Sequence, residues 1–201
     1  MNYHPWTHDD DEAFVQIDET PPEIEDKDFL LDEGRPASSW FPAEVVFDFS
    51  PVGGLKPVDS VPNTLGLYIV SEKLRSILES ASGARFEFLP VKLRNHKRKL
   101  LSEPYFVANL LDVVACVDRE HSEFRMNQLI THEIRRFKRL VLDTSKLGPD
   151  TKVFRLEERP DMFIIREDLA HTIIEAGCTG MVFMPMEDFG AEFRPKDNYD
   201  L

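Results

Sequence analysis

One pattern occurs twice in the chain, and it constrains the fold more than any other feature. The residue pattern predicts a strand, a loop, a second strand, a helix and a closing strand over residues 44–91, and the same order over 139–186. A shift of 95 residues aligns the two segments without a gap. Identical residues then recur several times more often than ordinary residue frequencies give by chance. The pattern predicts an internal duplication, with two similar units related by a pseudo-twofold axis.

The predicted elements are short, and strands outnumber helices. This mixture predicts an α+β fold with a mostly antiparallel sheet and a few short helices. Residues 105–110 and 112–117, which lie between the two units, are expected to pair as a hairpin, whereas the pattern does not decide the state of 126–137. The other strands are predicted at 44–49, 67–70, 85–91, 139–144, 153–157, 162–165 and 181–186, and the helices at 71–81 and 167–176.

Negative charge is concentrated at the start of the chain. The formal net charge is −13, yet residues 1–34 hold twelve Asp or Glu residues and a single base, Lys27, so the rest is nearly neutral. Repulsion between these carboxylates, together with the helix-breaking pair Pro21-Pro22, predicts an acidic and poorly ordered arm.

The remainder reads as one globular body. Hydrophobic residues make up 42% of the chain, which is enough for a real core. We expect an arm over 1–34, a single α+β domain over 35–190 and a tail over 191–201. The apolar residues 29–31 are expected to dock where the body begins. Because the two predicted units can pair with each other within one chain, the duplication slightly favours a monomer.

The sequence predicts a cytoplasmic protein. Its apolar runs are too short to span a bilayer, and its start lacks the basic and apolar regions of a signal peptide. Cys116 and Cys178 both lie in apolar stretches, which favours two buried, reduced thiols over a disulfide.

No catalytic residue, metal site or cofactor is predicted. The six histidines show no ligand spacing, and His132-Glu133 lacks the second histidine of a zinc-protease helix. Neither cysteine has the local signature of a hydrolase, and Gly53-Gly54 lacks the lysine of a phosphate-binding loop. We therefore expect a binding protein and not an enzyme.

Two charged clusters remain as candidate binding residues. The acidic arm is either a solvated tail or a contact for a basic partner. The basic strip 92–99 is either a phosphate contact or a charged turn that answers the arm within the same molecule. A second basic run, 134–139, is predicted to be an exposed edge strand protected by its charge. The candidate phosphate-binding residues are Lys92, Arg94, Lys97, Arg98 and Lys99.

Several apolar and turn motifs, taken together, carry a family resemblance over about residues 28–190. The motifs are Ser60-Val61-Pro62-Asn63 with Tyr68 to Leu74, Glu87 to Val91, Tyr105 to Asn109, Cys116-Val117-Asp118, Phe154-Arg155-Leu156 and Gly180 to Phe183. With them the chain resembles the immunity-protein family of bacterial polymorphic-toxin systems, whose prototype is a myxobacterial immunity protein.

The resemblance implies a non-catalytic protein that binds and neutralises a cognate toxin. Such a toxin is usually encoded in the neighbouring gene and is often a nuclease. Complementary charge would then speed docking on a basic toxin. The alternative function is a nucleic-acid-associated or regulatory module that uses the basic strip. Under the first hypothesis the candidate toxin contacts are Asp9, Asp10, Asp11, Glu12, Glu23, Glu25 and Asp26.

Overall fold

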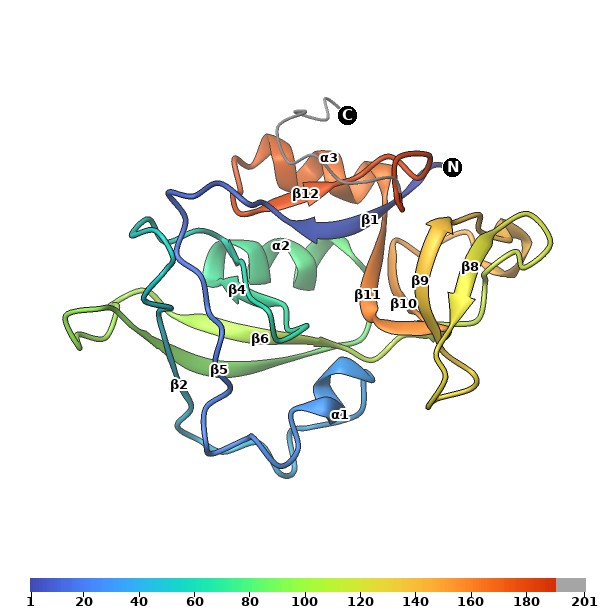
Figure 1. The fold of residues 1–201 in the computed structure, drawn as a ribbon. Helices are drawn as coiled ribbons and strands as arrows, with labels where there is room; N and C mark the ends of the chain where they lie inside the picture. Colours follow the sequence, from blue (N-terminus) through green and yellow to red (C-terminus); the bar gives the residue numbers. More distant parts are fainter. Residues whose placement is uncertain (191–201) are drawn as a thin grey trace.

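The computed structural model describes residues 1–190 and arranges them in two five-stranded sheets, a two-stranded hairpin and three short α-helices (Figure 1). The first sheet holds β2 (Val46–Asp48), β3 (Ser60–Val61), β4 (Ile69–Ser71), β5 (Phe86–Arg94) and β6 (Tyr105–Leu110). The second holds β1 (Tyr3–His8), β7 (Val113–Val114), β10 (Val153–Leu156), β11 (Arg159–Arg166) and β12 (Met181–Phe183). The hairpin is β8 (Glu123–Met126) with β9 (Ile134–Arg139), the α-helices are α1 (Phe29–Asp32), α2 (Glu72–Ala81) and α3 (Glu167–Glu175), and a 3-10 turn spans Thr144–Lys146.

Antiparallel pairing dominates both sheets. The first has the order β2-β5-β6-β4-β3 and the second β12-β1-β11-β10-β7. Between the named strands of residues 1–190, only β2 with β5 and β7 with β10 pair in parallel. The predicted α+β class with a mostly antiparallel arrangement is confirmed, although the strands form two large sheets and not one.

The two sheets share a local plan. In the first, α2 connects β4 to β5, and β6 lies between those two strands; in the second, α3 connects β11 to β12, and β1 lies between them. The helices begin at Glu72 and Glu167, which are 95 residues apart. The strand β2 has no counterpart, because residues 141–143 form only an isolated bridge from Leu142 to Val117. The internal duplication stays a prediction, which superposition of 44–91 on 139–186 would test.

The helices form where their local signals predict them. Ser71 caps α2, since its hydroxyl accepts a hydrogen bond from the Leu74 N–H at 3.3 Å. Leu74 and Leu78 then lie one turn apart and are fully buried. The two helices contact each other, and α2 also packs on β4 and β6 while α3 packs on β11.

Aromatic side chains fill the core beside the two helices. The rings of Tyr68 and Phe163 stack with their centroids 3.5 Å apart, and Trp6 meets both rings edge-on. The Phe163 N–H donates to the Tyr68 hydroxyl at 2.9 Å, and that hydroxyl donates to the Trp6 carbonyl at 3.3 Å. This core therefore joins β1, β11 and the residue before β4.

The predicted poorly ordered arm over residues 1–34 is wrong. The strand β1 pairs with β11 on one side and β12 on the other, and Trp6 is only 2% exposed. Residues 9–28 then run along the first sheet to α1 (Figure 1). Val15, Ile17 and Ile24 along this segment, and Leu31 on α1, are buried in the core of that sheet, and Phe14 is buried as well. The charge count concealed them, because acidic residues separate the apolar ones along the chain.

The middle of the chain also differs from prediction. Residues 105–110 do form β6, but 112–117 contribute only β7, which lies in the other sheet, so the expected hairpin is absent. The segment 126–137 is part of the β8–β9 hairpin and not a helix. Its strand β9 is charged and exposed at four of six positions, as predicted for the basic run. The strand expected at 139–144 is not formed, because β9 ends at Arg139, the residue where that strand was expected to begin.

One buried cation connects the two sheets and the N-terminal segment. Arg155, on β10, is 2% exposed and stacks on the Phe163 ring at 4.6 Å. Its guanidinium donates to the carbonyls of Leu110, Leu31, Asp32 and Pro160 at 2.6–2.9 Å. Burial lowers the pKa of Arg155 to about 10, so the group stays charged at neutral pH. A buried charge of this kind is tolerated only when its donors are satisfied.

Gly34 makes room for this arrangement. Its φ is +67°, and a Cβ there would lie 2.7 Å from the Leu110 carbonyl oxygen and 2.8 Å from Arg155 Cδ. A larger residue would therefore be strained and would also clash.

Replacement of Trp6 by alanine tests whether β1 is part of the core. We expect Trp6→Ala to lower the free energy of unfolding by about 3–5 kcal/mol, the usual cost of removing a buried tryptophan side chain. Urea unfolding followed by circular dichroism measures it. Val52→Ala is the control, since Val52 is 84% exposed. If the Trp6 variant were as stable as the wild type, the result would support the predicted poorly ordered arm and contradict the place of β1 in the core.

The role of Arg155 is tested by Arg155→Met, which keeps the aliphatic stem and removes every donor. Four carbonyl oxygens then lose a charged donor, so we expect a loss of about 3–5 kcal/mol in the free energy of unfolding. The control is Arg139→Met, because Arg139 is exposed on β9. A loss below about 1 kcal/mol would mean that water satisfies these carbonyls.

Candidate interaction surface

The first group of predicted contacts forms an ordered acidic turn, residues 9–12. The Asp9 carboxylate accepts the Asp11 N–H at 3.1 Å, and the Asp11 carboxylate accepts the Ala13 N–H at 2.9 Å. Asp10, Asp11 and Glu12 are exposed and Asp9 is half-buried. The glycine at position 54 lets the backbone approach this turn, since a Cβ there would lie 2.2 Å from the Ala13 carbonyl. The carboxylates of the acidic turn are therefore held by a folded backbone.

The second group forms an acidic loop, residues 23–26, which leads into α1. Glu23, Glu25 and Asp26 are exposed around Ile24, which is 2% exposed and anchors the loop in the core. The Ile24 N–H donates to the Pro21 carbonyl, and the Lys27 N–H donates to the Ile24 carbonyl, at 3.0 and 2.9 Å. The acidic loop is therefore as ordered as the acidic turn.

The structure does not bring the two groups together. The acidic turn lies beside the loop before β12, where the Asp9 N–H donates to the Gly180 carbonyl at 3.3 Å. The acidic loop lies at the far end of the same segment, next to α1 (Figure 1). The seven predicted contacts thus form two separate acidic sites.

The basic strip is divided as well. Lys92 and Arg94, on β5, face the acids of the parallel strand segment beside them: Lys92 pairs with Glu44 at 2.9 Å and Arg94 pairs with Asp48 at 2.5 Å. The Arg94 hydrogen bond holds the pKa of the Asp48 carboxyl below its usual value. These two bases therefore form ion pairs with acids in and just before β2. They form none with the acids of residues 1–34, although the intramolecular interpretation proposed such pairs.

The other three bases stand on the turn between β5 and β6. Lys97, Arg98 and Lys99 are exposed, and within residues 1–190 none of them has a carboxylate within ion-pair distance. The Asn95 side chain shapes the turn, because its oxygen accepts the N–H groups of Lys97 and Lys99 at 2.9 and 3.1 Å. This is the charged turn that the sequence allowed as one interpretation.

Burial shifts the pKa values of both cysteines and of one histidine. Burial raises the pKa of the Cys116 thiol to about 12 and that of Cys178 to about 11, so neither is a thiolate at neutral pH. Burial lowers the pKa of His8 to about 4. Among residues 1–190, no group of three His, Cys, Asp or Glu side chains is placed to hold a metal ion.

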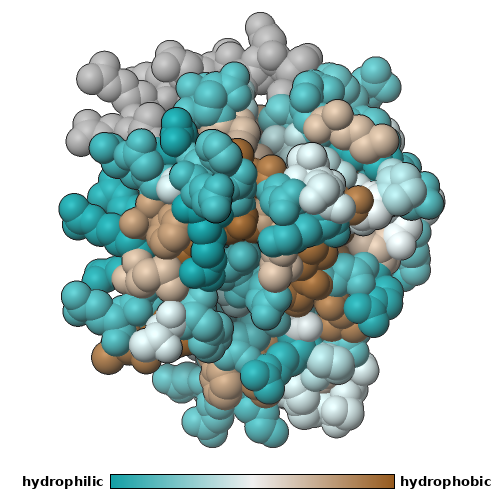
Figure 2. Space-filling view, turned by 90° about the vertical axis from the view of Figure 1, so that its right-hand side faces the viewer, coloured by the Kyte–Doolittle hydropathy of each residue, from teal (hydrophilic) through white to brown (hydrophobic). Residues whose placement is uncertain are grey.

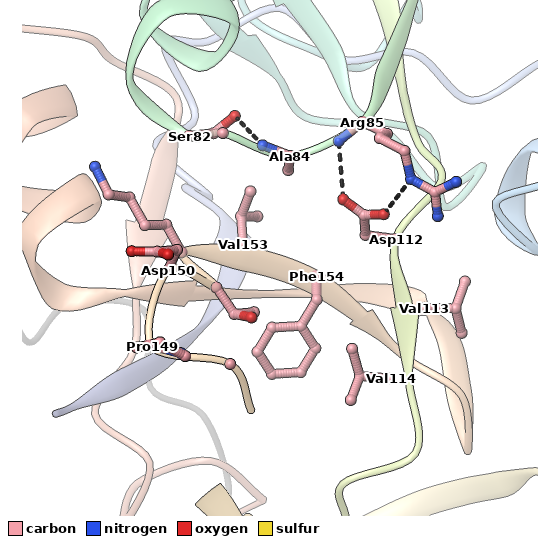
Figure 3. A pocket seen from close by; sticks show the side chains of 14 residues that line it. Ser82, Ala84, Arg85, Asp112, Val113, Val114, Pro149, Asp150, Val153 and Phe154 are labelled. Carbon is pink, nitrogen blue, oxygen red and sulfur yellow. Dashed lines mark hydrogen bonds and ion pairs between the residues drawn. The ribbon is translucent and has the colours of Figure 1, made fainter. Parts of the chain in front are cut away.

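A polar pocket of about 410 Å³ lies where the end of α2 meets β10 and the chain before β7 (Figure 3). Three of its four charged side chains are engaged. Arg85 contacts Asp112 at 2.6 Å, and the Lys152 ammonium donates to the Ala81 carbonyl at 2.8 Å. The lining residues contain no hydrogen-bonded pair of a nucleophile and a base.

A second hollow, of about 320 Å³, lies between α1, the β8–β9 hairpin and the start of β11, and we name it the α1 groove. Phe29 and Ile130 line it with their side chains partly exposed. Residues 29–31 were expected to dock on the body. Leu31 is buried as expected, whereas Phe29 is 52% exposed. The exposed apolar residues became recognisable only with the fold, because α1 and the β8–β9 loop are distant in sequence.

Asp32 lies in the wall of the α1 groove. Burial raises the pKa of its carboxyl to about 7, and the nearby Asp161, Asp28 and Glu33 act in the same direction, against the Arg155 charge. Its Oδ1 atom is buried without a hydrogen-bond partner among the described residues. Burial therefore favours the protonated form of Asp32 more than that of an ordinary carboxyl.

The model of the Immunity protein family (Imm11) matches residues 8–188. The chain belongs to this family. The match includes all helices and strands of residues 1–190 except most of β1. No curated protein shows significant similarity to the chain.

Membership in the immunity family indicates a toxin-neutralising protein, and immunity proteins generally act without catalysis. None of the helices within residues 1–190 has the length and hydrophobicity needed to cross a membrane. The family match names no contact residues. The class of partner is therefore inferred from the acidic turn, the acidic loop and the α1 groove.

Titration of Asp32 makes a testable contribution to stability. Because its folded-state pKa of about 7 lies above the usual value of 3.8, its contribution is fully present below about pH 4 and is lost as the pH rises through about 7. We expect Asp32→Asn to lack this loss. Its urea midpoint should therefore gain on that of the wild type between pH 4.5 and 7.5.

The control for this measurement is Asp168→Asn. A hydrogen bond from Arg166 lowers the pKa of the Asp168 carboxyl, so the wild type loses the contribution of this group only below about pH 4, and Asp168→Asn should differ from the wild type by a constant amount between pH 4.5 and 7.5. A constant difference between Asp32→Asn and the wild type over the whole range would contradict the raised pKa.

Proposed function

We propose that the chain is a non-catalytic immunity protein that binds one cognate toxin and neutralises it by covering its active site. The toxin is proposed to be a nuclease with a basic substrate groove. The proposal includes a cytoplasmic location and a free monomer that forms a one-to-one complex. Family membership supports the inhibitory role, and the acidic surface supports the class of partner.

The observation that carries the proposal is the ordered acidic surface. Asp9, Asp10, Asp11, Glu12, Glu23, Glu25 and Asp26 form no ion pair with any other residue of 1–190, and all of them stand on a backbone anchored in the core. A nuclease must attract phosphates, so its groove is basic. Carboxylates held in fixed positions can occupy such a groove with little loss of conformational entropy on binding.

The alternative function, binding to nucleic acid, has weaker support. Two of the five bases in the strip are neutralised by Glu44 and Asp48, which leaves three cations on a single turn. Three contacts of this kind would give weak and strongly salt-dependent binding. A gel-shift assay at low salt with DNA and RNA, compared with Lys97→Glu/Lys99→Glu, would detect it.

Neutralisation of the acidic groups tests the proposal. The first variant carries Glu23→Gln, Glu25→Gln and Asp26→Asn, and the second carries Asp9→Asn, Asp10→Asn, Asp11→Asn and Glu12→Gln. The partner is the protein encoded beside this chain's gene. We expect each variant to associate about tenfold more slowly at low salt and with a weaker salt dependence, because electrostatic steering is reduced. Stopped-flow fluorescence measures both quantities.

The control variant carries Glu79→Gln, Glu175→Gln and Glu187→Gln, three exposed acids elsewhere on the surface. Its association rate should match that of the wild type. Co-expression supplies the functional assay, in which the wild type should rescue growth of cells that make the neighbouring protein. Unchanged association rates for both acidic variants would place the contact elsewhere on the body, and a wild type that neither binds nor rescues would refute the proposed function.

A further inference from the structure

The α1 groove exposes apolar side chains that the rest of the described chain does not cover. Phe29 is 52% exposed on α1 and Ile130 is 42% exposed on the β8–β9 loop, and Leu129, which precedes Ile130 and lies outside the groove lining, is 93% exposed. Figure 2 turns the side that carries the β8–β9 hairpin toward the reader and shows apolar residues lying open between hydrophilic ones. Grouped exposure of large apolar residues beside a hollow is typical of a protein-binding site.

The loop that presents these residues is held in shape. The Asn127 side-chain oxygen accepts the N–H groups of Leu129 and Ile130 at 3.0 and 3.3 Å. The Glu133 N–H donates to the Ile130 carbonyl at 3.0 Å, which closes the turn. A partner that contacts this loop therefore meets a preorganised surface.

The charge of the groove indicates the chemistry of its partner. Asp32, Glu33, Glu133 and Asp161 line it, whereas its bases are Arg135 and Arg159. Arg159 is already paired with Asp161 at 3.2 Å and Glu33 with Arg35 at 2.6 Å, which leaves the carboxyls of Asp32 and Glu133 beside the single base Arg135. The acidic loop, residues 23–26, runs directly into α1 and adds further negative charge at this end of the molecule.

We propose that the α1 groove is the docking site for a basic segment of the cognate toxin. An apolar side chain of that segment packs between Phe29 and Ile130, and a lysine or arginine beside it meets the carboxylates of Glu133 and Asp32. This inference rests on the proposed function and deepens it, because it assigns the anchor of the complex to this groove and leaves steering to the acidic turn and loop.

Physical reasons favour this division of roles. Exposed rim charges mainly set the rate of association, whereas large apolar residues near the centre of an interface carry most of its affinity. The acidic turn and loop expose carboxylates without a large apolar residue among them. The α1 groove combines both kinds of group, and it continues the acidic loop along the chain.

The test compares the double variant Phe29→Ala/Ile130→Ala with the matched control Leu100→Ala/Ile174→Ala. Leu100, before β6, and Ile174, on α3, are 50% and 46% exposed, so the control removes similarly exposed apolar groups elsewhere. The probe is the purified protein encoded beside this chain's gene, titrated in isothermal calorimetry against each full-length variant. Thermal unfolding checks that each variant keeps the wild-type fold.

We expect the Phe29→Ala/Ile130→Ala variant to raise the Kd by about 10- to 100-fold, as the loss of two interface anchors does. The control should stay within about threefold of the wild type. Hydrogen–deuterium exchange on the wild-type chain provides a measurement without variants: the amides of residues 127–133 should exchange more slowly in the complex. This measurement decides the matter if the double variant does not fold.

Unchanged affinity of the folded double variant, or unprotected 127–133 amides in a wild-type complex, would overturn the groove assignment while the proposed function stands. Failure of the wild type to bind and neutralise the neighbouring protein would overturn both. The wild-type measurement therefore separates the two failures.

Discussion

A single buried guanidinium holds together parts of the chain that are far apart in sequence. Arg155 belongs to β10, yet its donors reach the last residue of β6, two carbonyls of α1 and a residue of β11. If one sheet moved away from the other, or α1 moved away from either, this buried charge would lose some of its hydrogen-bond acceptors. The position of the α1 groove and of the acidic loop therefore depends on an interaction within the core.

The elements that could be predicted are those with local signals. The cap at Ser71 and the apolar spacing of Leu74 and Leu78 define α2 within the chain segment itself. The continuous apolar run at 162–165 similarly predicts the buried strand β11. The prediction of α+β class follows from such pieces, and so does the position of α3, which begins where the predicted helix does.

The elements that could not be predicted depend on distant partners. The strand β1 contains His4, Pro5 and His8, which do not indicate a buried strand, and it is one only because β11 and β12 lie on either side of it. The α1 groove has the same origin, since Phe29 and Ile130 become neighbours through folding. The remaining clue was the spacing of Phe14, Val15 and Ile17 among the acids, which indicates a segment that packs on a sheet.

The central place of β1 has a consequence for synthesis of the protein. Residues 3–8 leave the ribosome long before their partners, residues 164–166 and 181–183. Until those partners emerge, the first strand has no sheet to join, and such long-range pairing is slow. The nascent chain must therefore keep Trp6 and its strand unpaired until β11 and β12 have been made, and the acidic turn that follows β1 is fixed to the loop before β12 only from then on.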